Sequence, residues 1–424
     1  MYLQVITKQV ALALLTGASV LAQAPLPNGP YRGEFQTPNG KVPFNFDVKS
    51  GNGSAKTAYL LNANEREELT GVQQEGDSVF IPIPLYNATL RFRQSGNQLT
   101  GIYKAGEGQP IPVTAEFGRT DRYEQGAAPT VSLNGKWDIG VQRNLNDPND
   151  INQTVGVFEQ KGSRVTGTVL TVTGDYRYLD GQVTGNEFRL SSFSGSAPAV
   201  LQGTINPDGT LTGEFRYIRG AFPLTGKKND NAKLPDLYSL TYLKPGYKKE
   251  NGPALRFTFP DLNGKSVSLA DAKYKGKVVI VTILGSWCPN CIDETAFLAP
   301  WYKANHQRGV EIIGLAFERK NDPAFAKTAL TRLINRYDVQ YDILFAGIAD
   351  KKVASDALPA LNKVLAFPTT IILDRQGNVA QIHTGYTGPA TGKYYEEYVA
   401  EFNQTINKLL KNEPVAATTG GGEK

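Results

Sequence analysis

The pattern of apolar and polar residues divides the chain into two parts. From Gly29 to about Gly226, apolar and polar residues alternate over short runs, as they do in Lys41–Val48. Such alternation is typical of strands with one buried face. Dipeptides that favour tight hairpin turns stand between the runs, at Asn39-Gly40, Asp180-Gly181 and Asp208-Gly209. No helical period persists here for three turns, so this part is predicted to be an antiparallel β region, meander-like or barrel-like.

The β region shows signs of an internal duplication. Asn28-Gly29-Pro30-Tyr31 opens one half, and Asn134-Gly135-Lys136-Trp137 opens the other. Near the ends of the halves, Gln98–Tyr103 resembles Thr210–Phe215. Each half has room for roughly seven or eight short strands. We therefore predict two β-rich repeats, over residues 23–128 and 129–230, which form either two small barrels or one large sheet.

After the β region the pattern changes to one of alternating strands and helices. Lys277–Leu284 is a continuous, β-branched apolar run, as expected for a buried parallel strand. Asp322 precedes a proline, a combination that starts helices, and Lys393–Leu410 has the pattern of an amphipathic helix. We predict an α/β domain over residues 253–411, joined to the β region by a polar linker over residues 231–252.

The two ends of the chain have compositions of their own. Lys8 precedes an apolar stretch, Val10–Leu21, which small residues follow. This pattern predicts a secretory signal peptide over residues 1–22, with an uncleaved anchor as the alternative. A signal peptide would place the protein in the periplasm or cell envelope. Residues 412–424 are rich in alanine, threonine and glycine and are predicted to be a disordered tail.

Composition and charge narrow the range of functions. The length of 424 residues suits two or three domains. The net charge of +5 is small and scattered, so no nucleic-acid partner is expected. The chain contains only two cysteines. Exported proteins commonly use disulfides as structural links, so a single, closely spaced pair is expected to serve thiol exchange instead.

The two cysteines form the strongest chemical motif. Cys288 and Cys291 are separated by Pro289 and Asn290, and Cys288 follows the predicted strand Lys277–Leu284 after three intervening residues. A cysteine at a helix N-terminus meets unpaired N–H groups and the positive end of the helix dipole, and both favour the thiolate. A second thiol, two residues further on, can resolve a mixed disulfide. The motif predicts a redox-active dithiol that needs no further cofactor and no metal.

Further motifs give the C-terminal part a family resemblance. Phe367-Pro368-Thr369-Thr370 opens another apolar strand. Together with Trp287-Cys288-Pro289-Asn290-Cys291, it makes residues 253–411 resemble the thioredoxin superfamily, and in particular the TlpA/ResA-like periplasmic thiol-disulfide oxidoreductases. That branch carries a glutamate three residues after the second cysteine, where Glu294 stands. The buried aspartate of thioredoxin itself is replaced here by Thr282.

The resemblance implies a role for each residue of the site. Cys288 would attack, Cys291 would resolve, and Glu294 would relay a proton, although a surface glutamate is the alternative for Glu294. Three residues would form the surface on which the substrate docks: Trp287, Phe367 and Pro368, with Pro368 as a cis-proline that faces the dithiol. The implied function is reduction of disulfides in protein substrates, with a membrane-bound protein as the electron donor.

Three other functions remain open at this stage. A peroxiredoxin would need threonine or serine three residues before its cysteine, where Gly285 stands. A copper or zinc carrier could use Cys288 and Cys291, but His306 and His383 lack the spacing of further ligands. A binding or adhesion protein would depend on the β region alone. That region contains no histidine or cysteine, so we expect it to be separate from the redox chemistry and to dock a partner.

Overall fold

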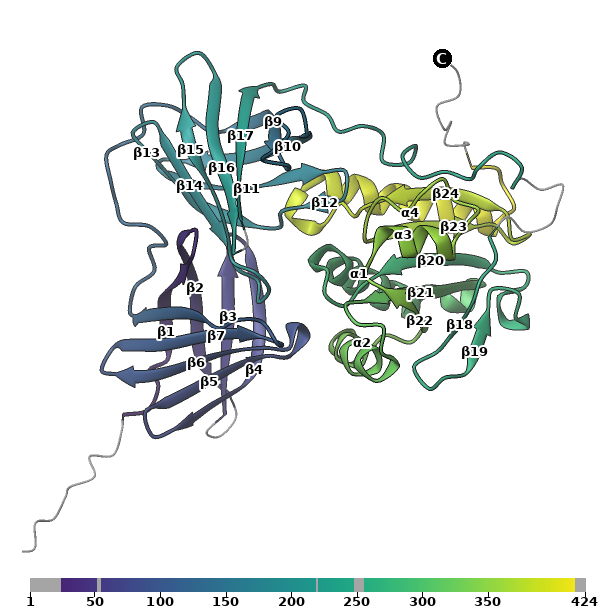
Figure 1. The fold of residues 1–424 in the computed structure, drawn as a ribbon, viewed down its shortest axis with the longest axis horizontal. Helices are drawn as coiled ribbons and strands as arrows, with labels where there is room; N and C mark the ends of the chain where they lie inside the picture. Colours follow the sequence, from purple (N-terminus) through teal and green to yellow (C-terminus); the bar gives the residue numbers. More distant parts are fainter. Residues whose placement is uncertain (1–23, 52–54, 219, 248–254, 416–424) are drawn as a thin grey trace, which may run out of the picture.

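The structure is a computed structural model that describes residues 24–51, 55–218, 220–247 and 255–415. Two β-barrels are followed by an α/β domain (Figure 1). The predicted signal peptide and most of the predicted tail lie outside the described residues. In the part of the chain that is described, no helix is long and apolar enough to cross a membrane.

The first barrel closes through its first and last strands. Its eight antiparallel strands follow chain order: β1 (Gly29–Thr37), β2 (Gly40–Ser50), β3 (Lys56–Asn62), β4 (Glu65–Glu75), β5 (Ser78–Ile83), β6 (Ala88–Ser95), β7 (Gln98–Ala105) and β8 (Ile111–Phe117). β1 pairs with β8 as well as with β2, which removes both sheet edges. Alternate residues point inward, and Tyr31 stacks on Phe46 in the core.

The second barrel repeats this arrangement with one addition. Its strands are β9 (Gly135–Gln142), β10 (Ile151–Lys161), β11 (Arg164–Thr171), β12 (Gly174–Asp175), β13 (Leu179–Thr184), β14 (Glu187–Ser192), β15 (Ala199–Ile205), β16 (Thr210–Tyr217) and β17 (Gly220–Lys228). β10 pairs with β11 and closes the ring, while the short β12 pairs only with β11. β12 points toward the C-terminal domain (Figure 1).

Equivalent contacts in the two barrels support the duplication. Tyr31 donates a hydrogen bond to the carbonyl of Pro27, and Trp137 donates one to the carbonyl of Leu133, in both cases four residues earlier. The repeated Leu-Thr-Gly motif lies on β7 and β16, the seventh strand around each barrel. The prediction of a duplicated antiparallel region is confirmed. Of the two arrangements left open, two small barrels or one large sheet, the structure has the two barrels.

The two barrels pack into one unit. Phe193, which follows β14, lies in the core of the first barrel against Phe35 and Phe44. The buried guanidinium of Arg122 donates hydrogen bonds to Asn45 of the first barrel and to the carbonyl of Ser191 in the second, at 3.1 and 3.0 Å. The Phe193 ring, which we call the plug, and the buried, hydrogen-bonded guanidinium of Arg122 fix the barrels against each other.

The C-terminal domain is a five-stranded sheet in the order β22-β21-β20-β23-β24, with helices packed on it. Its elements are the hairpin β18 (Thr258–Pro260) and β19 (Ser266–Ser268), the strands β20 (Val278–Leu284), β21 (Val310–Glu318), β22 (Asp342–Ile348), β23 (Thr369–Leu373) and β24 (Val379–Thr384), and the helices α1 (Pro289–Asn305), α2 (Pro323–Tyr337), α3 (Lys351–Ala357) and α4 (Lys393–Leu410). β20 is the central strand, parallel to β21 and antiparallel to β23. Every residue of β20 is buried, which explains the continuous apolar run.

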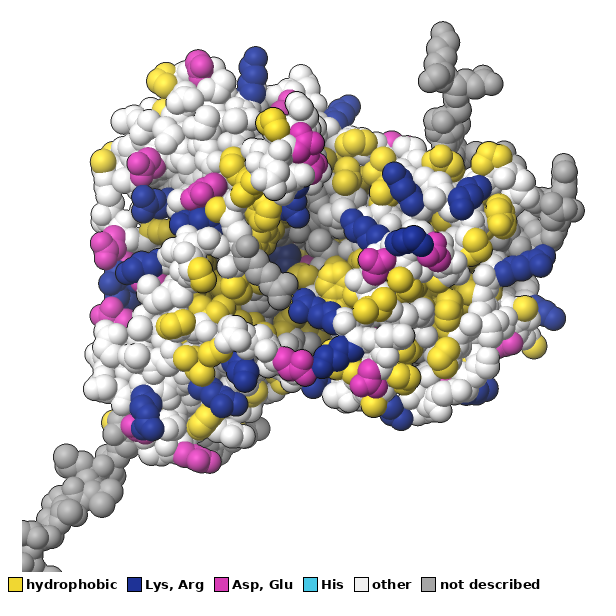
Figure 2. All heavy atoms as spheres, in the orientation of Figure 1, with side chains coloured by type: hydrophobic (Ala, Val, Ile, Leu, Met, Phe, Trp, Pro, Cys, Tyr) yellow, Lys and Arg dark blue, Asp and Glu magenta, His cyan; other side chains and the backbone are white. Residues whose placement is uncertain are grey.

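The predicted linker is partly bound to the C-terminal domain. Thr384 at the end of β24 donates a backbone hydrogen bond to Leu237, and Leu243 forms an isolated bridge with Leu361. The segment that joins the barrels to this attachment, residues 229–236, contains no helix or strand. The barrels and the C-terminal domain meet along a seam where charged and apolar side chains lie side by side (Figure 2).

Candidate active site

The two thiols lie at the N-terminus of α1, directly after β20. Cys288 is the N-cap residue, and its Sγ accepts a hydrogen bond from the backbone N–H of Cys291 at 3.3 Å. Pro289 begins the helix, where a missing N–H costs nothing. Both cysteines are free thiols; Cys288 is 6% exposed and Cys291 is fully buried. The cap geometry holds the two sulfurs within one helical turn.

The segment before β23 faces the first cysteine. The peptide bond between Phe367 and Pro368 is cis. The Cys288 thiol donates to the carbonyl of Phe367 at 3.3 Å. The rings of Trp287 and Phe367 meet edge to face, with centroids 5.5 Å apart. The structure therefore brings Trp287, Phe367 and Pro368 together beside Cys288.

Glu294 lies inside the domain, with 1% of its surface exposed. Its two carboxylate oxygens accept hydrogen bonds from the hydroxyls of Thr282 on β20 and Thr370 on β23. Burial raises the pKa of Glu294 to about 7, although both hydroxyls act in the opposite direction. Burial, with further contributions from Cys288 and Glu294, also raises the pKa of the Cys291 thiol well above its usual range. The alternative of a surface glutamate does not hold.

A second buried carboxylate, which the sequence analysis missed, fixes the turn before the thiols. Glu318 ends β21, and its oxygens accept from the backbone N–H and from the hydroxyl of Ser286, each at 2.8 Å. It is 1% exposed, and burial raises its pKa. Glu318 thereby positions the turn that leads to Trp287 and Cys288. No spacing rule connects residues 32 positions apart, so the sequence contained no signal for it.

Residues of the barrels contact the helix that carries the dithiol and the segment that follows β24. Arg177, between β12 and β13, forms ion pairs with Glu65 of the first barrel at 2.6 Å and with Asp293 of α1 at 3.1 Å. Asp175 on β12 accepts a hydrogen bond from the backbone of Gly388 at 3.0 Å. These contacts reach Asp293 and Gly388 rather than the two thiols, so the expectation that the β region is separate from the redox chemistry stays a prediction.

The histidines do not join the thiols. His383 is buried, with Nδ1 3.0 Å from the carbonyl oxygen of Gly385, and burial lowers its pKa to about 4. His306 lies just beyond the C-terminal end of α1, whereas Cys288 caps the opposite end. Within the described ranges, no three or more histidine, cysteine, aspartate or glutamate side chains group as metal ligands.

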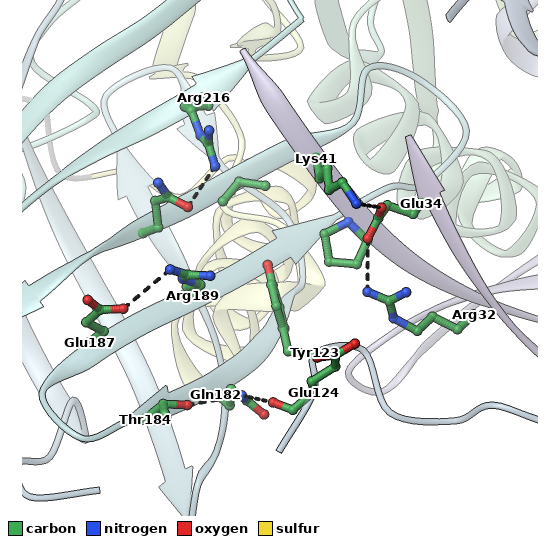
Figure 3. A pocket seen from close by; sticks show the side chains of 13 residues that line it. Arg32, Glu34, Lys41, Tyr123, Glu124, Gln182, Thr184, Glu187, Arg189 and Arg216 are labelled. Atoms are coloured by element: carbon green, nitrogen blue, oxygen red, sulfur yellow. Dashed lines mark hydrogen bonds and ion pairs between the residues drawn. The ribbon is translucent and has the colours of Figure 1, made fainter. Parts of the chain in front are cut away.

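A cavity of about 470 Å³ lies between the two barrels (Figure 3). Its lining comes from both barrels and the segment that joins them, and it includes no residue of the C-terminal domain. Five of its charged side chains pair with one another: Glu34 with Arg32 and Lys41, and Glu187 with Arg189. The cavity is therefore separate from the dithiol, and most of its charged lining residues already have ion-pair partners.

Comparisons with known proteins agree with this geometry. Residues 251–382 match the AhpC/TSA family. The thiol-disulfide oxidoreductase ResA of Halalkalibacterium halodurans is 28% identical over 174 residues, which cover 40% of this chain and 84% of that protein. ResA of Bacillus subtilis is 28% identical over 151 residues, which cover 35% of this chain and 75% of the Bacillus subtilis protein. The C-terminal segment is therefore similar to the ResA thiol-disulfide oxidoreductases.

A solved structure is also similar to the C-terminal segment. It is a thiol:disulfide interchange protein of the thioredoxin family from Chlorobium tepidum, with 21% identity and a TM-score of 0.29. The match covers 38% of this chain and 96% of that one. The predicted α/β fold of the C-terminal domain is confirmed by its own five-stranded sheet and the helices packed on it. The roles of the individual site residues are still predictions.

Proposed function

We propose that this protein is an exported protein-disulfide reductase that works through Cys288 and Cys291. The observation that carries the proposal is the pair of free thiols at the start of α1, with Cys288 against the carbonyl of Phe367 and Glu294 buried beneath. Relatives named as thiol-disulfide oxidoreductases support the reaction class. The predicted signal peptide and the resemblance to periplasmic reductases support export and the reducing direction.

The first step is attack by Cys288 on a substrate disulfide. The Cys288 thiolate forms a bond to one substrate sulfur while the substrate S–S bond breaks, and the departing sulfur leaves as a thiolate that takes up a proton. Cys288 is the attacking sulfur because it caps the helix, where backbone N–H groups stabilise negative charge. Trp287 and Phe367 provide the apolar surface beside it.

The second step releases the product. Cys291 passes its proton to the Glu294 carboxylate and attacks the Cys288 sulfur of the mixed disulfide. The second substrate thiolate leaves, and a Cys288–Cys291 disulfide remains, so two electrons have moved from the protein to its substrate. A raised pKa of about 7 lets Glu294 both accept and return this proton near neutral pH. A membrane-bound dithiol protein would restore the reduced pair.

Trapping of the mixed disulfide tests the proposal. In the Cys291→Ser variant the second step is blocked, so the protein should accumulate intermolecular disulfides through Cys288 that run as heavier species on non-reducing gels. The Cys288→Ser variant keeps the buried thiol and serves as the matched control, with no such species expected. Equal trapping by both variants, or equal alkylation rates of the two reduced thiols, would contradict the order of attack.

Peroxide reduction is the second candidate, because the AhpC/TSA match covers the same residues. A threonine or serine hydroxyl three residues before Cys288 would be required, and Gly285 stands there. A Cβ at Gly285 would lie 2.2 Å from Nε1 of Trp287, so a larger side chain does not fit. Turnover of hydrogen peroxide faster than that of a free thiol would favour the peroxidase. A copper or zinc carrier would instead show stoichiometric metal in the purified, reduced protein.

A further inference from the structure

The second barrel rests directly on the dithiol motif through the turn between β11 and β12, residues 171–175, which we call the barrel turn. A Cβ built on Gly174 would lie 2.1 Å from Nδ2 of Asn290, the residue between the prolyl position and the second cysteine. A Cβ on Gly385 would lie 2.8 Å from the carbonyl carbon of Thr173. Gly385 in turn donates a hydrogen bond to the carbonyl of Pro368 at 2.9 Å. The barrel turn therefore contacts both sides of the site.

Arg177 holds the barrel turn in this position. One guanidinium nitrogen, Nη2, lies 2.6 Å from Glu65 Oε1 and 3.1 Å from Asp293 Oδ1, so a single cation links both barrels to α1. Burial alone would lower the pKa of Arg177, but Asp293 and Glu65 raise it well above its ordinary value. The Arg177 side chain is 13% exposed. Removing one partner of such a buried ion pair strongly destabilises the contact, because the other charge is left buried without a partner.

The contact has a consequence for substrate access. Cys288 is only 6% exposed, while a protein disulfide must bring its sulfur into line with the attacking sulfur. A folded or extended substrate chain cannot occupy the place beside Asn290 and Gly385 while the barrel turn fills it. We propose that the barrel pair is a cap over the dithiol, held closed by Arg177, and that it must lift away before a protein substrate can react.

The rest of the seam is compatible with such a movement. A further ion pair across it, Lys320–Glu107 at 2.6 Å, is exposed to solvent and contributes little. Arg336–Glu67 at 3.0 Å is partly buried and is a second charged contact that opening would break. The chain passes from the barrels to the C-terminal domain through residues 229–236, which contain no helix or strand. The seam also contains apolar contacts, since Leu85 and Tyr86 pack against the core of the C-terminal domain, so opening would expose these two side chains. The barrel pair, fixed internally by Phe193 and Arg122, would move as one body.

The cap can be tested by comparing reagents of two sizes on the reduced, full-length protein. N-ethylmaleimide and a large polyethylene-glycol maleimide react by the same chemistry, and peptide mass spectrometry locates the label on Cys288. In the parent protein the large reagent should be strongly disfavoured. Arg177→Ala should raise the rate of the large reagent by at least about tenfold relative to the small one, since a buried ion pair is lost. Arg164→Ala removes an exposed ion pair with Asp180 on the same barrel and should leave the ratio unchanged.

Each outcome decides the proposal. If the Arg177→Ala variant does not fold, the Asp293→Lys variant removes the same Arg177–Asp293 ion pair by changing the residue on α1. The same rise in the rate of the large reagent relative to the small one is then required. An unchanged ratio in the folded variant, or a parent protein that reacts equally with both reagents, would overturn the cap. The proposed cap rests on the proposed exchange function, because it controls the access of a protein substrate to Cys288. Alkylation reports access to the sulfur without any exchange step, so a failure of the cap and a failure of the exchange function are told apart.

Discussion

The buried carboxyl group of Glu294 should make the C-terminal domain less stable at alkaline pH than at acid pH. Burial raises the pKa of Glu294 from 4.5 to about 7. Because the pKa of Glu294 is higher in the folded protein than in the unfolded chain, folding favours the protonated carboxyl group. The stability that this group contributes is therefore complete at low pH and is lost as pH rises through about 7. At about 1.4 kcal/mol for each tenfold change in proton affinity, ionised Glu294 costs about 3 kcal/mol at pH 8.

The substitution Glu294→Gln isolates this cost. Glutamine keeps the shape of the side chain and can hydrogen-bond to the hydroxyls of Thr282 and Thr370, but it does not ionise. The variant should be more stable than the parent by about 3 kcal/mol at pH 8, and this advantage should vanish toward pH 4. Urea unfolding followed by tryptophan fluorescence at several pH values measures the difference, because Trp287 and Trp301 lie in this domain.

The matched control is Glu397→Gln, which removes an exposed carboxylate from α4 of the same domain. It should change the unfolding free energy by less than about 0.5 kcal/mol at every pH. A difference between the Glu294→Gln variant and the parent that stays constant from pH 4 to pH 8 would refute the reasoning. Glu294 would then be ionised in the folded protein without penalty, and its pKa would be ordinary.

Further predictions follow from the same structure. The disulfide-exchange rate should rise with pH through about 7 as Glu294 becomes able to accept a proton. The Glu294→Gln variant should lack this rise in rate, which stopped-flow kinetics at several pH values measures. Phe193→Ala should destabilise the barrel pair by about 3–5 kcal/mol, measured by urea unfolding with circular dichroism, because the ring fills the first barrel's core; a loss below about 1 kcal/mol would show that the plug is dispensable. Glu318→Gln should cost about 1–3 kcal/mol, since one of two hydrogen bonds from Ser286 is lost; unchanged stability would contradict its positioning role.

Local patterns made much of the fold predictable. Alternation and turn dipeptides identified the β region, and the repeated Leu-Thr-Gly motif marked the seventh strand of each barrel. Closure into two barrels was left open because it depends on the pairing of β1 with β8, at opposite ends of the repeat. The buried run Val278–Leu284 and the two cysteines located the C-terminal site because strand burial and helix capping act over a few residues.

The parts of the site that were not predicted depend on contacts between distant segments. Glu318 and Ser286 meet only because β21 lies beside β20. Arg177 and Asp293 meet because two folded bodies dock, and neither residue has any local pattern that sets it apart from a solvated charge. Burial of Glu294 likewise follows from the facing strands that carry Thr282 and Thr370.

The reduction potential of the Cys288–Cys291 pair tests the central claim most directly. Equilibration of the full-length protein with defined thiol–disulfide buffers, followed by mass spectrometry of the alkylated cysteines, measures it. A reductase should show a single two-electron transition near about −270 mV, the range of thioredoxin. A potential above about −180 mV would make the protein an isomerase or an oxidant and contradict the direction. Absence of a reversible transition between dithiol and disulfide would contradict the exchange function itself.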